Sequence, residues 1–133
     1  MKDKRQHTIC FPLLIPTVFM LCSACAGVQE ESETIHMDRP EALTMEMGSF
    51  YYKPDHIVLE NGGTLLIHLT NVSDSKHNLT VKNPEEEIIA TVDLAGGKSG
   101  ELRLDLRAPG IYPFYCDIPF HTTLGMEGRF EVK

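Results

Sequence analysis

The carboxyl-terminal part of the chain carries a cysteine, a histidine and a methionine at regular intervals. Cys116, His121 and Met126 follow a Cys-x4-His-x4-Met spacing, and His77 lies upstream at the beginning of a hydrophobic alternation. A thiolate, two imidazoles and a weak axial thioether are the ligands of a mononuclear blue-copper centre. Zinc could use the same nitrogen and sulfur donors, but the thioether position favours copper.

Each of these residues also has a structural explanation when it is taken alone. A lone cysteine is often a small buried hydrophobe, and methionine commonly fills gaps in a core. A lone histidine is more often a hydrogen-bonded core residue than a ligand. The four residues together, in this order and at loop spacing, favour a metal site over the structural explanation. Cys116 also has no partner for a disulfide, because the other three cysteines lie within the first 25 residues.

The amino-terminal segment is typical of an exported protein. Three basic residues precede an apolar run over residues 9–21 that contains two prolines. This run is too short for a membrane-spanning helix, which needs about 20 apolar residues. We therefore predict a signal peptide over residues 1–24. Two kinds of processing fit the sequence. The segment LCSAC (21–25) is similar to a bacterial lipobox with the lipid on Cys25, whereas ACA (24–26) would release a soluble protein.

Length and composition limit the number of domains and the class of partner of the chain. The chain has 133 residues, which allows one compact domain, and its net charge of -7 argues against nucleic acid as a partner. Residues 25–41 are acidic and have little apolar pattern, so we expect a flexible spacer there. A single domain would then occupy residues 42–133.

Alternating hydrophobicity predicts that this domain is all-β. Apolar residues recur with a period of two from residue 42 onward, and turn signals such as Asn61-Gly62-Gly63 and Pro109-Gly110 separate the runs. The inward-facing sets are Met45/Met47, Leu65/Ile67/Leu69, His77/Leu79/Val81, Ile88/Ala90/Val92/Leu94, Leu102/Leu104/Leu106, Tyr112/Phe114/Cys116 and Phe130/Val132. Seven or eight short strands at this spacing indicate a two-sheet antiparallel Greek-key sandwich. His77 would then come from one strand, and the other three donors from the loop joining the last two strands at the same pole.

With these residues in place, the chain from about Met45 to Lys133 resembles the cupredoxins, the small blue-copper electron carriers. The resemblance rests on His77-Asn78, Gly110-x-Tyr112-x-Phe114-x-Cys116, His121, Met126-x-Gly128 and the terminal strand. It implies that His77, Cys116 and His121 are equatorial copper ligands and that Met126 is axial. It also implies that Asn78 braces the two ligand segments by hydrogen bonding, while Ile118 and Phe120 form an apolar shell around the centre.

Two positions depart from the pattern of the longer-loop cupredoxins. Phe120 stands where those proteins usually carry glycine, and Asp117 places a charge directly after Cys116. We expect the Phe120 ring to cover part of the copper pole. The ligand set itself is intact.

The resemblance predicts an exported carrier of single electrons that uses one copper ion, cycling between Cu2+ and Cu+. Its partners would be redox proteins such as cytochromes or membrane electron-transfer complexes, and a lipid anchor would be its only contact with the membrane. An extracytoplasmic copper chaperone or storage protein is the alternative. An enzyme is not expected, since copper enzymes of this kind need a second copper centre. The acidic run Glu85–Glu87 is interpreted as a solvated loop rather than as a docking patch.

Overall fold

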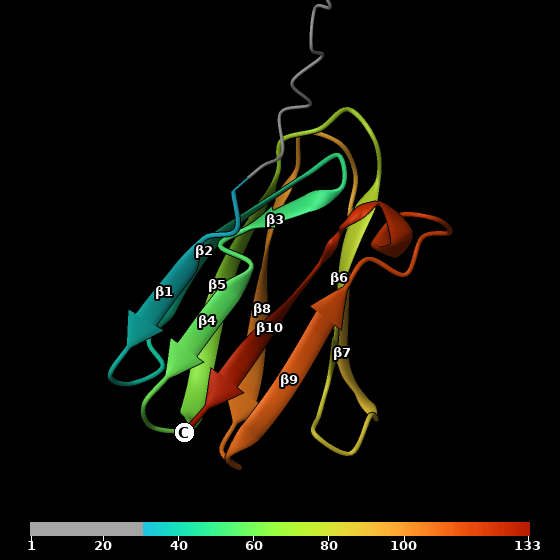
Figure 1. Cartoon of the computed structure of the whole chain (residues 1–133). Helices are drawn as coiled ribbons and strands as arrows, with labels where there is room; N and C mark the ends of the chain where they lie inside the picture. The colour runs from blue at the N-terminus through green and yellow to red at the C-terminus, as the bar shows by residue number, and fades with distance from the viewer. Residues whose placement is uncertain (1–30) are drawn as a thin grey trace, which may run out of the picture.

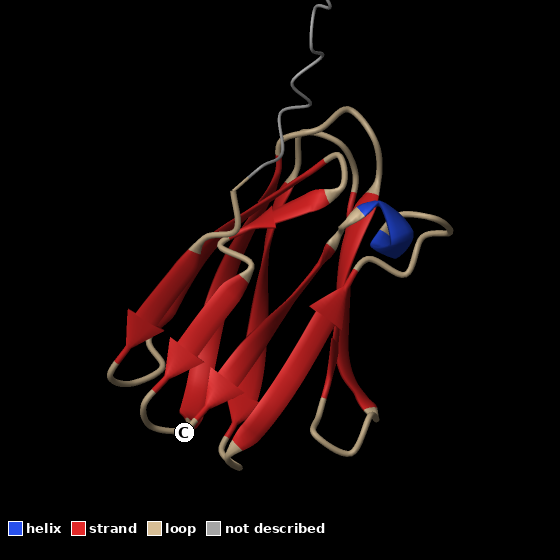
Figure 2. Ribbon diagram, in the orientation of Figure 1, coloured by secondary structure: helices blue, strands red, loops and turns tan. Residues whose placement is uncertain are grey.

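A computed structural model describes residues 31–133, which form two β-sheets packed face to face (Figures 1 and 2). The predicted signal peptide (residues 1–24) and Cys25 lie outside the described residues. Between residues 31 and 133, no helix has the length and apolar character needed to span a bilayer.

The two sheets contain six and four strands. The larger sheet has the spatial order β1 (Thr34–Met37), β4 (His56–Leu59), β10 (Glu127–Val132), β9 (Gly110–Tyr115), β6 (His77–Lys82) and β7 (Ile88–Leu94). The smaller sheet has the order β3 (Tyr51–Lys53), β2 (Ala42–Gly48), β5 (Gly63–Asn71) and β8 (Ser99–Leu106). A short 3-10 helix, η1 (Thr122–Leu124), lies between β9 and β10.

The all-β sandwich is confirmed, but two details of the prediction are wrong. The described residues contain ten strands rather than seven or eight, and both sheets are mixed rather than antiparallel. Strands β1 and β10 each pair with β4 in parallel, as β2 does with β5. Strands β1, β3 and β4 have only three or four residues each, too few to show a clear alternation.

The ordered domain also begins earlier than residue 42. Residues 34–37, which were expected to belong to the flexible spacer, form β1 at the edge of the larger sheet. Ile35 and Met37 are partly buried and pack against the core. Their alternation with Thr34 and His36 is a two-residue pattern too short to stand out within an acidic segment.

The core is one layer of side chains between the sheets. Most of the predicted inward sets are buried: Leu65, Ile67 and Leu69 have no exposed surface, and neither have Met45 and Met47. The set on β7 is the exception, because Ile88 is exposed and Ala90 and Val92 are only partly buried. Aromatic rings fill the centre, with Phe114 and Phe130 at a centroid distance of 4.8 Å. Burial of these alternating faces fixes the register of the strands, because a slip by one residue would turn each set toward solvent.

One end of the sandwich gathers the loops that follow β2, β5, β7 and β9. We call this end, formed by residues 49–50, 72–76, 95–98 and 116–126, the upper pole, since it lies at the top in Figure 1. Backbone contacts join these loops: the amide of Gly97 donates to the carbonyl of Ser73, and the amide of Asn71 to that of Lys98. The opposite end, where β6 turns into β7, is called the lower pole.

Candidate metal centre

Two neighbouring strands bring His77 and Cys116 to the upper pole. His77 is the first residue of β6, and Cys116 directly follows β9. The two strands are antiparallel neighbours, with Thr80 opposite Tyr115 and Val81 opposite Phe114. The beginning of β6 therefore lies beside the end of β9. Both side chains point inward and are buried.

The loop between β9 and β10 folds back on itself and supplies the other two predicted ligands. The amide of Cys116 donates to the carbonyl of Met126 at 3.1 Å, and the amide of Met126 donates to the carbonyl of His121 at 3.0 Å. The Thr122 hydroxyl donates to the Cys116 carbonyl at 2.8 Å. Gly125, with a φ of 106°, ends η1 in a left-handed conformation that favours glycine. These bonds hold Cys116, His121 and Met126 around one short turn.

The donor atoms of three predicted ligands converge. One ligand atom each from His77, Cys116 and His121 lie within 4.8 Å of one another, and this is the one such group of His, Cys, Asp or Glu found in residues 31–133. The two histidine Nδ1 atoms are 3.1 Å apart, and the Cys116 Sγ atom is 3.5 Å from the His121 Nδ1 atom. Met126 is fully buried in the same turn. This sulfur and nitrogen donor set fits copper.

His77 does not have the surroundings of a structural histidine. Only 1% of the residue is exposed, and its Nε2 atom is the one buried side-chain nitrogen or oxygen without a hydrogen-bond partner in the described part of the chain. A buried polar atom is normally paired, so Nε2 is an exception, although the nitrogen that faces His121 is Nδ1. Burial, followed by the neighbouring His121, lowers the pKa of His77. A neutral imidazole keeps a lone pair for a metal ion at neutral pH.

Asn78 connects the two ligand-bearing segments. Its side-chain Oδ1 atom accepts from the backbone amide of Asp117 at 2.9 Å, and its Nδ2 atom donates to the Asp117 carboxylate. These are the bracing contacts expected for Asn78. The unusual charge at Asp117 is one of the acceptors, a role that the sequence did not indicate.

Tyr52 supports this connection from the opposite sheet. Its hydroxyl donates to the backbone carbonyl of Asn78 at 2.5 Å. Burial, with smaller effects from Cys116 and Asp117, raises the Tyr52 pKa, so the hydroxyl keeps its proton and remains a donor. The role of Tyr52 was not predictable from the sequence, because a tyrosine on a three-residue strand carries no signal of a distant hydrogen bond.

The apolar surroundings differ from the expected ones. Ile118 is partly buried and packs against the core. Phe120 has a φ of 71° and is 80% exposed, so its ring shields little of the donor group. Phe50, from the turn between β2 and β3, packs edge-on against the His121 ring at a centroid distance of 5.1 Å. The expected cover by Phe120 is wrong. Phe50 was missed, since only the fold brings that turn to His121.

The other three histidines within residues 31–133 lie apart from this group. His68 pairs with Glu101 at 3.1 Å on the outer face of the smaller sheet. His56 contacts Glu131 through its Nε2 atom at 3.3 Å. His36 is exposed on β1. None of the three extends the donor group.

Comparisons with known proteins agree with the fold. The sequence family described as the cupredoxin-like domain matches residues 13–129. The search of curated protein sequences found no match. A reduced auracyanin from the photosynthetic bacterium Roseiflexus castenholzii is similar with 23% identity and a TM-score of 0.63, covering 71% of this chain and 98% of that one.

Two further solved structures have the same fold. Auracyanin B is 17% identical with a TM-score of 0.60, over 80% of this chain and 93% of its own. Auracyanin A, a "blue" copper protein from the green thermophilic photosynthetic bacterium Chloroflexus aurantiacus, is 23% identical with a TM-score of 0.56, over 70% of this chain and 100% of its own.

Proposed function

This chain belongs to the cupredoxin-like domain family, and we propose that it carries single electrons through a type 1 copper ion bound by His77, Cys116, His121 and Met126. One observation carries the proposal: donor atoms of the two histidines and the cysteine lie within 4.8 Å of one another at the upper pole. The auracyanin relatives, one of which is described as a blue copper protein, support it at the level of the fold.

The residues at the upper pole have distinct tasks in this proposal. Copper supplies a one-electron couple between Cu2+ and Cu+ when it is bound. His77 offers a neutral imidazole because its pKa is lowered, and Cys116 offers a thiolate from a buried position. Asn78 fixes the start of β6 against the ligand loop, so the donors keep their places when the charge at the centre changes.

The rim of the centre suits docking with a redox partner. His121 is partly exposed, while Phe50, Phe120 and Leu124 are exposed large hydrophobic residues from the same pole. We call Phe50, Phe120 and Leu124 the apolar rim. An apolar surface around an exposed ligand edge gives a partner a short path to the centre and excludes water on contact. Cytochromes and membrane electron-transfer complexes are the proposed partners, and an enzymatic role is not proposed.

We also propose that the protein works outside the cytoplasm, either lipid-anchored at Cys25 or released as a soluble form. The predicted signal peptide supports export. The lipobox-like segment before Cys25 supports the anchored form.

Spectroscopy of the copper-loaded full chain tests the proposed function. We expect an intense visible absorption band, a type 1 electron paramagnetic resonance spectrum and reversible one-electron cycling. Cys116→Ser should abolish the band, because the charge transfer comes from the thiolate. His68→Gln is the matched control and should keep it, since His68 pairs with Glu101 away from the centre.

Two results would contradict the proposal. A band that survives in Cys116→Ser would mean that another residue binds copper. A colourless cuprous protein that transfers its copper without cycling would instead support the alternative, a copper chaperone.

A further inference from the structure

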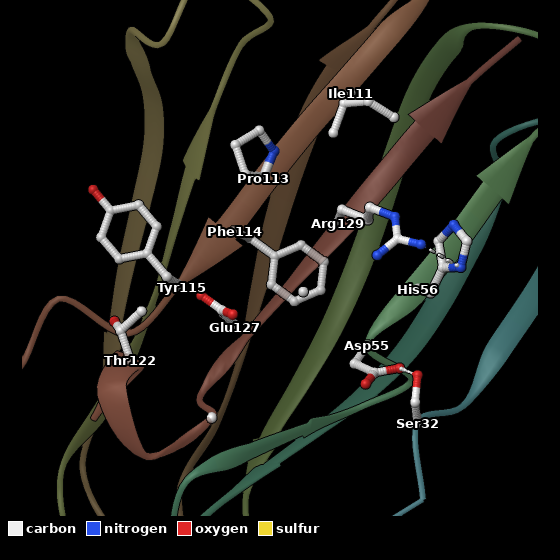
Figure 3. Close-up of a pocket in the computed structure, with 12 residues that line it drawn as sticks. Ser32, Asp55, His56, Ile111, Pro113, Phe114, Tyr115, Thr122, Glu127 and Arg129 are labelled. Atoms are coloured by element: carbon white, nitrogen blue, oxygen red, sulfur yellow. Dashed lines mark hydrogen bonds between the residues drawn. The ribbon is translucent and has the colours of Figure 1, made fainter. Parts of the chain in front are cut away.

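The described chain joins the sandwich beside the metal centre. Ahead of β1, the Glu33 carbonyl accepts from the amides of Asp55 and His56, both at 3.2 Å. The Ser32 hydroxyl donates to the Asp55 carboxylate at 2.9 Å, the contact drawn in Figure 3. Residues 32 and 33 are therefore fixed to the connection between β3 and β4.

This connection and the ligand loop line the same hollow on the outer face of β4, β10 and β9. The hollow has a volume of about 520 Å³, with Ser32 and Asp55 on one side and Thr122 of the ligand loop on the other (Figure 3). Gly125 of the same loop also lines it. The amide of Arg129, near the start of β10, donates to the Asp55 carbonyl at 2.9 Å. The chain thus enters the domain at the upper pole.

The carboxyl terminus leaves the domain from the opposite end. Strand β10 runs from Glu127, next to the ligand loop, to Val132 at the lower pole, where Figure 1 marks the C-terminus. Six residues of strand span about 20 Å. A tether at the carboxyl terminus would therefore leave the upper pole about 20 Å farther from its attachment point than a tether at residue 33.

The sequence then limits how far an amino-terminal anchor could reach. Glu33 lies eight positions after Cys25, and a fully extended chain over that distance in sequence spans at most about 28 Å. We infer that the protein holds its upper pole close to the bilayer and exchanges electrons with a membrane-embedded redox complex. This inference rests on the lipid anchor at Cys25, which is part of the proposed function. A small globular domain is about 30 Å across, so a soluble partner has little room between the pole and the lipid.

Energy transfer on vesicles tests this arrangement. The full chain is expressed with its leader, acylation of Cys25 is verified by mass spectrometry, and the copper-loaded protein is reconstituted into phosphatidylethanolamine–phosphatidylglycerol vesicles. The vesicles carry a fluorophore on the lipid headgroup, and its emission overlaps the visible absorption band of the copper centre. The comparison protein carries Cys25→Ser and a hexahistidine tag after Lys133, bound to nickel-chelating lipid in otherwise identical vesicles. We expect several-fold stronger quenching in the acylated protein, and its loss when copper is reduced.

A kinetic measurement tests the class of partner. Soluble ferrocytochrome c should reduce the acylated protein several-fold more slowly than the carboxyl-terminally tethered protein on equivalent vesicles. Equal quenching in the two arrangements, or an unmodified Cys25, would overturn the inferred geometry. Equal reduction rates would overturn the membrane-embedded partner. If neither protein shows the visible absorption band, the proposed function itself fails. If both show the band but quench equally, only the inferred geometry fails.

Discussion

Met126 lies fully buried in the turn that holds Cys116 and His121, with its backbone bonded to both. A thioether in the axial position is a weak donor that stabilises cupric copper more than cuprous copper. We predict that Met126→Leu keeps the blue colour and raises the reduction potential, measured by redox titration of the visible band. Met45→Leu is the matched control, because Met45 is equally buried but belongs to the core on β2. An unchanged potential in Met126→Leu would mean that Met126 is not axial.

Asn78 is a second residue whose contribution can be separated from ligand binding. It is 3% exposed and exchanges two hydrogen bonds with Asp117 through its side chain. Asn78→Ala removes both bonds and takes away the side-chain acceptor of the Asp117 backbone amide, so we expect a loss of about 2 kcal/mol in the free energy of unfolding. Denaturant unfolding of the copper-free protein measures the loss.

A matched asparagine provides the reference for that measurement. Asn61 donates one exposed hydrogen bond to the carbonyl of Asp38. Asn61→Ala should therefore change the stability by no more than about 0.5 kcal/mol. Equal losses in the two variants would show that Asn78 does not brace the ligand segments.

Among the elements, the long strands with one buried face were predictable and the short ones were not. Strand β5 buries every second residue, and its period of two identifies it in the sequence. Strands β3 and β4 are too short for this signal, and alternation does not tell whether neighbouring strands run parallel. At the metal centre, sequence spacing indicated the four proposed ligands. The positions of Phe50 and Tyr52 could not be predicted, because only the packing of β2 and β3 brings them to the centre.

Strand β10 depends on a glycine where it leaves the ligand loop. A Cβ atom at Gly128 would lie 2.3 Å from the Asp55 carbonyl oxygen and 2.4 Å from the Phe114 ring. Gly128→Ala must push β10 away from β4 or displace Phe114, and we expect a loss of about 3 kcal/mol in stability. Thermal or denaturant unfolding of the copper-loaded and copper-free protein measures it.

A variant at a second glycine, Gly97, shows how much of the loss comes from backbone conformation rather than from crowding. A Cβ atom at Gly97 meets nothing within 4 Å, although its φ of 67° is unfavourable for alanine. Gly97→Ala should therefore lose only about 1 kcal/mol. If both variants lost the same amount, the close approach of β4, β9 and β10 at Gly128 would not be needed for the fold.

At the scale of the whole molecule, the sandwich places two candidate docking surfaces, one apolar and one acidic, at opposite ends. The apolar rim lies at the upper pole, whereas Glu85–Glu87 occupy the turn between β6 and β7 at the lower pole (Figure 1). In that turn Glu86 pairs with Lys82 and Glu87 bonds to Asn83. Two of the three glutamates are thus bonded within their own turn.

This separation predicts which surface controls electron transfer to a basic soluble probe. Strand β6 has six residues and places the two poles about 20 Å apart, well beyond the Debye length of about 8 Å at 0.15 M salt. In stopped-flow reactions of the unanchored Cys25→Ser protein with cytochrome c at that ionic strength, we expect Phe120→Ser to slow transfer several-fold. Replacing Glu85, Glu86 and Glu87 together with glutamine should change the rate less than twofold, because screening hides these charges from the upper pole. The reverse ranking would move the docking surface to the lower pole, and electrons would then have to cross the length of the sandwich to reach His77 and Cys116.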